Sequence, residues 1–141
     1  MKIGIIGSGR VGYSMGKYMQ DHGIRVTGFY DRHRERALDA AQFTGTDSFD
    51  RIEDLVAASD TLFLTTSDGE IANVWDCIRH LSIQGKIICH FSGSLSSDQF
   101  QGIEKTRAYG LSIHPMLAFS DKYTSYKQLQ NAFFTLEGHA Q

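Results

Sequence analysis

The fold is decided at the start of the chain, by the stretch Met1-Lys2-Ile3-Gly4-Ile5-Ile6-Gly7-Ser8-Gly9-Arg10-Val11-Gly12. An apolar run over residues 2–6 has the composition of a buried strand. It leads directly into three glycines spaced Gly-x-Gly-x-x-Gly. After them the apolar residues Val11, Met15, Tyr18 and Met19 recur at the spacing of one helix face. A glycine-rich turn between a strand and a helix predicts a phosphate-binding turn.

Each glycine of the turn has its own physical role. Gly7 permits the tight turn, Gly9 lets the backbone approach a pyrophosphate, and Gly12 lets the helix lie close to the strand. Amide hydrogens and the positive end of the helix dipole would hold the phosphates. The predicted cofactor-binding residues here are Gly7, Ser8, Gly9, Arg10, Val11 and Gly12. A turn that merely connects strand to helix is the alternative.

A second motif residue lies at the spacing from this turn that dinucleotide-binding domains require. Asp31 closes the run Phe29-Tyr30-Asp31, nineteen positions after Gly12. A carboxylate there accepts hydrogen bonds from the adenosine ribose and repels a 2′-phosphate, which favours NAD. Arg32 and Arg34 follow, and either could grip a 2′-phosphate or form a solvated first helical turn. The sequence therefore predicts NAD or NADP as cofactor and leaves the choice open.

Strand-like runs alternate with helix-like segments along the whole chain. The expected strands are Lys2–Ile6, Arg25–Tyr30, Thr61–Thr65, Lys86–His90, Arg107–Ile113 and Ala132–Leu136. This alternation predicts an α/β fold, a doubly wound, mostly parallel Rossmann sheet with helices on both faces. With 141 residues and no linker, we expect residues 1–141 to form one NAD(P)-binding domain.

Further helices are expected between the strands. Ile71, Val74, Trp75 and Ile78 share one helix face, and Ser67 with Glu70 resembles a capping box ahead of it. A shorter helix is expected over Arg51–Ala58. Ser96 or Ser97 is expected to cap another, with Phe100 and Ile103 facing inward.

Composition excludes several classes of partner. Hydrophobic residues make up 41% of the chain and charged residues 21%, and the formal charge is −2. Such a mixture has no basic footprint for nucleic acid, and no apolar run approaches the roughly 20 residues of a membrane helix. We expect no nucleic-acid or membrane partner, no metal site and a cytoplasmic location. Cys77 and Cys89 sit in apolar contexts and are expected to be buried thiols.

Three segments should meet beyond the carboxyl ends of the strands, where α/β sheets bind ligands. Thr65, Thr66 and Ser67 could contact the cofactor, or Ser67 could be only a helix cap. His90-Phe91-Ser92-Gly93-Ser94 and Ser112-Ile113-His114-Pro115-Met116 follow the next two strands. Ser92 and His114 are the candidate catalytic residues, because a histidine with a pKa near 6.5 can exchange a proton with a substrate hydroxyl. Alternatively His114 only pins the Pro115 turn, and His90 points into the sheet.

The glycine turn and these three segments, in this order along the chain, resemble a family of NAD(P)-dependent oxidoreductases in the 6-phosphogluconate dehydrogenase and ketopantoate reductase-like group. The resemblance implies a carboxy-terminal helical domain, absent from this chain, that completes the substrate pocket and forms most of a homodimer interface. A more distant similarity is to prephenate dehydrogenase, and it implies a histidine at His114 that hydrogen-bonds the substrate hydroxyl, with Ser92 nearby. The arginines that bind the substrate carboxylates in that family have no counterpart here.

The expected function is therefore the dinucleotide-binding half of an oxidoreductase acting on a small hydroxyl or carbonyl substrate. A non-catalytic NAD(P)-binding redox sensor or regulatory module is the alternative. Because one wall of the site is missing, we expect the chain alone to bind cofactor with little or no turnover.

Overall fold

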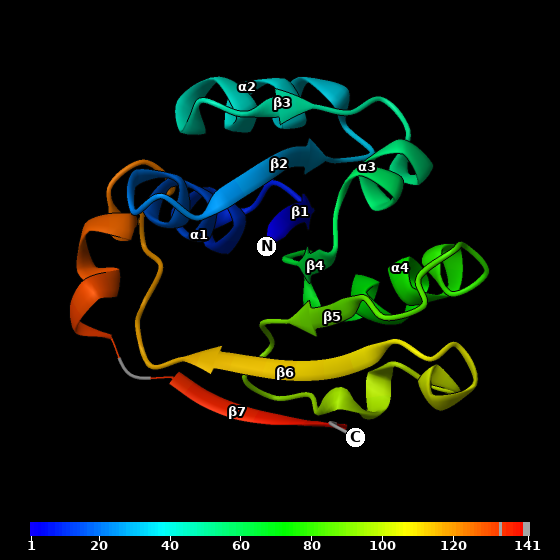
Figure 1. Ribbon diagram of the computed structural model, residues 1–141. Helices are drawn as coiled ribbons and strands as arrows, with labels where there is room; N and C mark the ends of the chain where they lie inside the picture. The colour runs from blue at the N-terminus through cyan, green and yellow to red at the C-terminus, as the bar shows by residue number, and fades with distance from the viewer. Residues whose placement is uncertain (133, 140–141) are drawn as a thin grey trace.

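The computed structural model describes residues 1–132 and 134–139 (Figure 1). Its centre is one seven-stranded sheet in the order β3-β2-β1-β4-β5-β6-β7. All neighbours pair in parallel except β6 and β7, which are antiparallel. The strands are β1 Lys2–Ile6, β2 Arg25–Tyr30, β3 Asp47–Ser48, β4 Thr61–Leu64, β5 Ile87–His90, β6 Tyr109–Pro115 and β7 Phe134–His139. The predicted doubly wound Rossmann sheet is confirmed.

Helices cover both faces of this sheet. They are α1 Arg10–Asp21, α2 Arg34–Thr44, α3 Ile52–Ala58 and α4 Ile71–Ile78, with short 3-10 turns η1 Asp68–Glu70, η2 Ser97–Gln99, η3 Ile103–Lys105 and η4 Ser125–Asn131. One apolar cluster joins α1 and α2 to the sheet, and η4 lies beside α1 on the same face (Figure 1). The other joins α3 and α4 to the opposite face and includes the buried Trp75 and Phe100. These two cores fix the sheet and so the ends of its strands.

The order of the strands positions the site. From β1 the chain winds outward through β2 to β3, then returns to β4 on the other side of β1. The connections after β1 and β4 therefore diverge to opposite faces, and a crevice opens between them at the carboxyl ends of the strands. The glycine turn follows β1 directly, so it lies at this switch point.

Several sequence expectations about element ends were wrong. β6 runs on through His114 and Pro115, which pair with Thr135 and Phe134 of β7, so the expected His-Pro turn is strand. β7 accordingly begins at Phe134 rather than Ala132. β3 was missed because it has only two residues, Asp47 and Ser48, and neither suggests a strand.

The helix ends also differ from expectation. The Ser67 side chain makes no cap hydrogen bond to a residue that the structure describes. Its carbonyl accepts the Glu70 N–H at 2.9 Å, and a 3-10 turn separates it from α4. The capping-box prediction was therefore wrong. Ser96 does cap a turn, since its Oγ accepts the Asp98 N–H at 3.1 Å, but that turn is 3-10 and three residues long. Phe100 and Ile103 are buried as predicted. Within the described ranges, every helix is too short or too polar to cross a membrane.

Candidate dinucleotide-binding site

At two positions of the glycine turn, the backbone conformation or the close packing requires a glycine. Gly7 has φ +100°, and a Cβ there would lie 2.8 Å from the Thr66 backbone nitrogen. A Cβ on Gly12 would lie 2.6 Å from Thr65 Oγ1 and 2.7 Å from the Gly7 carbonyl oxygen. The first glycine therefore makes the turn, and the third lets α1 lie against the end of β4.

Gly9 is different, because none of the described residues demands glycine there. Its φ of −91° is open to any residue, and among the described residues a Cβ would meet just the Thr65 carbonyl oxygen, at an ordinary 3.6 Å. α1 begins at the next residue, with no acidic residue in its first turn and no side-chain cap in the described part of the chain. Gly9 thus exposes backbone beside an uncapped helix start, which is the arrangement that a pyrophosphate requires.

Thr65 holds this turn in place. Its Oγ1 donates a hydrogen bond of 2.6 Å to the Gly7 carbonyl oxygen, and the side chain is buried. The contact ties the end of β4 to the turn after β1 across the switch point. Thr65 therefore lines the site and also positions the turn.

Asp31 connects the turn to the end of β2. Its Oδ2 accepts the Ser8 N–H at 2.9 Å and its Oδ1 accepts the His33 N–H at 2.8 Å. Each carboxylate oxygen can accept a further bond, so both remain able to bind a hydroxyl. The half-buried carboxylate fixes the shape of the site and also offers it acceptors.

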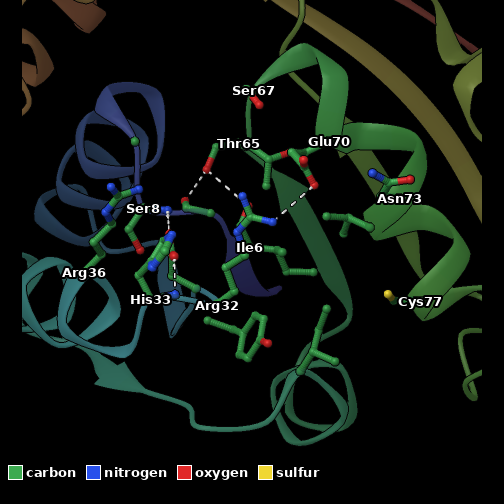
Figure 2. Close-up of a pocket in the computed structure, with 17 residues that line it drawn as sticks. Ile6, Ser8, Arg32, His33, Arg36, Thr65, Ser67, Glu70, Asn73 and Cys77 are labelled. Atoms are coloured by element: carbon green, nitrogen blue, oxygen red, sulfur yellow. Dashed lines mark hydrogen bonds and ion pairs between the residues drawn. The ribbon is translucent and has the colours of Figure 1, made fainter.

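A cavity of about 530 Å³ opens beside these residues (Figure 2). Its lining includes eight of the predicted cofactor residues, Gly7, Ser8, Gly9, Asp31, Arg32, Thr65, Thr66 and Ser67. The other three predictions, Arg10, Val11 and Gly12, belong to the start of α1 and lie outside the lining that the described residues form. The structure therefore brings together the turn, the end of β2 and the connection after β4.

Sequence reasoning missed the other half of the lining. Those residues are Ile6, Tyr30, His33, Arg36, Ile52, Glu70, Asn73, Val74 and Cys77. A signal existed for four of them, because Glu70, just before α4, and Asn73, Val74 and Cys77 within it repeat at helical spacing. Figure 2 shows Glu70, Asn73 and Cys77 in succession along that helix.

The two candidate arginines have different partners. Arg32 lines the cavity, and its Nη1 lies 3.8 Å from Glu70 Oε2. Arg34 instead pairs with Asp50, with 3.0 Å between Nε and Oδ1, and is not among the lining residues found in the described chain. Of the two, Arg32 is the one placed to meet a cofactor.

The candidate catalytic segments lie against each other, outside that cavity. A Cβ on Gly93 would stand 2.5 Å from Cε1 of His114, so the 92–94 loop covers the imidazole. Ser92 is buried, and its Oγ accepts the Ser94 N–H at 3.2 Å. His114 is half-buried, and its Nδ1 has no hydrogen-bond partner among the described residues. The structure thus brings the two segments together and leaves the buried Nδ1 of His114 without a partner among the described residues.

His90 has a structural role, as the sequence alternative suggested. Its ring is fully buried. Nε2 lies 2.7 Å from the Ser96 carbonyl oxygen, and Nδ1 accepts the Ser92 N–H at 3.2 Å. These partners fix the neutral tautomer with its proton on Nε2.

The two cysteines do not share one environment. Cys89 is buried as expected, and burial raises the pKa of its thiol to about 12. Cys77 is exposed and lines the cavity, so the expectation for it was wrong. Its apolar neighbours Trp75 and Ile78 occupy the buried face of α4, which leaves Cys77 on the other. Within the described residues, no cluster of His, Cys, Asp and Glu could hold a metal ion.

Comparison with known families agrees with this geometry. A family described as oxidoreductases with an NAD-binding Rossmann fold matches residues 1–84. The chain belongs to this oxidoreductase family. The family match covers the glycine turn, Asp31 and the whole lining of the cavity. A comparison with curated proteins finds no match.

Solved structures share the fold at low sequence identity. A Bacteroides fragilis protein assigned as an NADP oxidoreductase aligns with a TM-score of 0.85 and 19% identity over 99% of this chain and 52% of its own. A reductive aminase from Aspergillus terreus, in complex with NADPH and ethyl levulinate, gives 0.72 and 18% over 96% of this chain and 46% of its own.

An imine reductase variant from Myxococcus stipitatus, in complex with NAD+, gives a TM-score of 0.68 and 20% identity over 84% of this chain and 40% of its own. The chain therefore spans about half the length of these proteins.

Proposed function

We propose that the cavity binds the adenosine half of NAD(H) and that the protein is an NAD-dependent oxidoreductase acting on a small hydroxyl or carbonyl substrate. One observation carries the proposal. Packing against the described residues gives Gly9 no reason to be glycine, yet it stands between a helix start that none of them caps with a side chain and the Asp31 carboxylate. A phosphate bound at the helix start would explain the glycine, and a ribose bound at Asp31 would explain the carboxylate.

The preference for NAD rests on the charges around the cavity. Asp31 and Glu70 are both in the lining, so a 2′-phosphate would meet two carboxylates. Arg32 is engaged by Glu70 and Arg34 by Asp50. Arg36 and His33 also line the cavity and would accommodate NADP with lower affinity.

We place the reaction beside Ser92 and His114. Nicotinamide, when bound, supplies or accepts the hydride. His114 would exchange a proton with the substrate hydroxyl through a ring nitrogen. Its buried Nδ1 has no hydrogen-bond partner among the described residues. Ser92 would orient the same hydroxyl. The proximity of Gly93 to the imidazole supports a shared site for the two residues.

We also propose that further polypeptide completes the substrate pocket. The cavity is lined by the residues that we expect to bind the adenosine half of the cofactor. Ser92 and His114 lie outside the lining that the described residues form. The matched structures are about twice as long as this chain. A helical domain, dimeric in the group related to 6-phosphogluconate dehydrogenase and ketopantoate reductase, would supply the missing wall. The 141-residue chain should then bind cofactor with little or no turnover.

Titration of the chain with NAD+, NADH, NADP+ and NADPH tests the cofactor proposal, repeated on Asp31→Ala. We expect saturable binding, tighter for the NAD pair, and at least about tenfold weaker NAD binding in the variant, which loses charged acceptors. Equal affinities for NAD in the two proteins would show that Asp31 takes no part. Binding of none of the four would overturn the proposal.

The catalytic roles need the substrate-competent protein. There, His114→Asn should lower kcat by about a hundredfold or more and leave cofactor affinity unchanged. An unchanged kcat would remove His114 from the reaction. A protein that binds NADH and turns over no hydroxyl or carbonyl substrate would instead be the redox sensor or regulatory module.

A further inference from the structure

One ion pair crosses the cofactor cavity from side to side. Arg32 follows β2 and Glu70 precedes α4, so the two residues come from opposite walls of the crevice. Figure 2 shows the Arg32 guanidinium extended across the cavity toward the Glu70 carboxylate. The separation is 3.8 Å, and the side chains are 71% and 37% exposed. Such a pair is weak and can be opened by a ligand.

The position of the pair matters because of Asp31. If the Asp31 carboxylate marks the ribose hydroxyls, Arg32 is the neighbouring cation that could contact a 2′-phosphate. In the structure its Nη1 faces Glu70 instead. A 2′-phosphate would have to draw Arg32 away from this carboxylate and would also be repelled by it. NAD, with a neutral hydroxyl at that position, meets neither obstacle.

We propose that Glu70 sets the cofactor preference, because it holds Arg32 and adds negative charge where a 2′-phosphate would bind. The inference rests on the proposed function and names the second acidic determinant of that site, on the wall opposite Asp31. Glu70 would act on NADP through Arg32 and through space, and would leave NAD binding almost untouched.

The effect of the Glu70 charge on cofactor preference can be tested without disturbing the fold. Glu70 flanks the first turn of α4, but its side chain makes no cap hydrogen bond to any described residue. Replacing it with glutamine keeps the shape and removes the charge. A matched control exists at the start of α3, where Nε of Arg51, the residue before the helix, and Glu53 Oε1 form an exposed pair at 3.6 Å. Neither residue belongs to the lining of the cavity in the described chain.

The experiment measures NAD+ and NADP+ dissociation constants for wild type, Glu70→Gln, Glu53→Gln, Arg32→Gln and the double variant at positions 32 and 70. Glu70→Gln should bind NADP+ about two- to fivefold tighter at low salt, the range of an exposed charge pair, with NAD+ affinity unchanged. The gain should shrink in the Arg32→Gln background and at high salt. Glu53→Gln should match wild type.

Either of two results would overturn the inference alone. If Glu70→Gln and Glu53→Gln give the same NADP+ to NAD+ ratio while wild type binds NAD+, Glu70 has no part in selection and the proposed function stands. If the gain is equally large without Arg32, Glu70 does not act through that arginine. Wild type that binds neither dinucleotide would overturn the proposed function itself, and the inference with it.

Discussion

At the scale of single residues, Cys77 and Cys89 are two thiols with opposite surroundings. Cys77 is exposed in the cavity wall, whereas Cys89 is 1% exposed in β5 with a pKa raised to about 12 by burial. Near neutral pH, iodoacetamide should therefore alkylate Cys77 and spare Cys89, since the thiolate is the nucleophile. Bound NADH should slow the labelling of Cys77, as peptide mass spectrometry can measure.

Labelling of Cys77 at the same rate with and without saturating NADH would place the cofactor elsewhere.

The same thiol shows what could and could not be predicted for single residues from the sequence. Asp31 was found because strand context and spacing to Gly12 identify it. Cys77, Glu70 and Asn73 were missed although they repeat at helical spacing, because only the packed fold determines that their side of the helix turns toward the crevice.

At the scale of elements, the loop after β5 is held by side chains from three adjacent strands. His90 of β5 contacts the Ser96 carbonyl oxygen, and Ser112 of β6 donates to the Leu95 carbonyl oxygen at 3.1 Å. Glu137 of β7 accepts from both the backbone N–H and the Oγ of Ser97, at 2.7 and 2.6 Å. The loop that carries Ser92 is thus fixed by the edge strand as well as by its own.

Removing the Glu137 carboxylate should loosen this loop. Glu137→Ala leaves the buried Ser97 without its acceptor, so we expect a loss of about 1–2 kcal/mol in the free energy of unfolding. Hydrogen exchange should rise mainly over residues 92–97. Uniformly faster exchange over the whole sheet would contradict a local role, and Glu137→Gln, which keeps one acceptor, should lie between alanine and wild type.

A second contact between elements depends on pH. Asp39 of α2 accepts the hydroxyls of Tyr13 in α1, at 2.5 Å, and Tyr123 before η4, at 2.8 Å. The bonds from Tyr13 and then Tyr123 lower the pKa of the Asp39 carboxyl below its usual value. Because the folded pKa lies below the unfolded one, the stability that Asp39 adds is present above the unfolded pKa and is lost as pH falls through the folded value.

We therefore expect Asp39→Asn to lower Tm near neutral pH, with a gap to wild type that narrows as pH falls below about 4. Thermal melts over that range measure the effect. Asp54→Asn, at an exposed position of α3, is the control. A gap that stays constant or widens on acidification would have the wrong sign for this contact.

Elements with strong periodicity were predicted well, and those set by pairing were not. α1 and α4 follow from their apolar faces, of which Met15, Met19, Ile71, Trp75 and Ile78 are buried. The other predicted members, Val11, Tyr18 and Val74, are half-buried. β3 and the extension of β6 through Pro115 arise from pairing with neighbouring strands, which local sequence does not encode. The capping-box pattern at Ser67 was misleading because the chain forms a 3-10 turn there before α4 begins.

At the scale of the whole molecule, the reversal of strand order between β1 and β4 makes the crevice, and the glycine turn equips it for phosphate. Substitutions of Gly12 and Gly9 are therefore expected to have different effects. Gly12→Ala should destabilise the fold by about 1–3 kcal/mol, because its Cβ meets Thr65 Oγ1 at 2.6 Å and overpacks the junction of α1 and β4. Gly9→Ala meets no such contact among the described residues.

In our account, position 9 is glycine because a bound dinucleotide must approach the backbone closely there. The most direct test is the NADH dissociation constant of Gly9→Ala beside that of wild type, measured by fluorescence titration, with Tm recorded for both. We predict an unchanged Tm, since among the described residues beyond its chain neighbours the added Cβ would meet just the Thr65 carbonyl oxygen, at 3.6 Å. Binding should be weaker by about tenfold or more because backbone approach is blocked. NADH bound equally tightly by a folded Gly9→Ala protein would contradict the account.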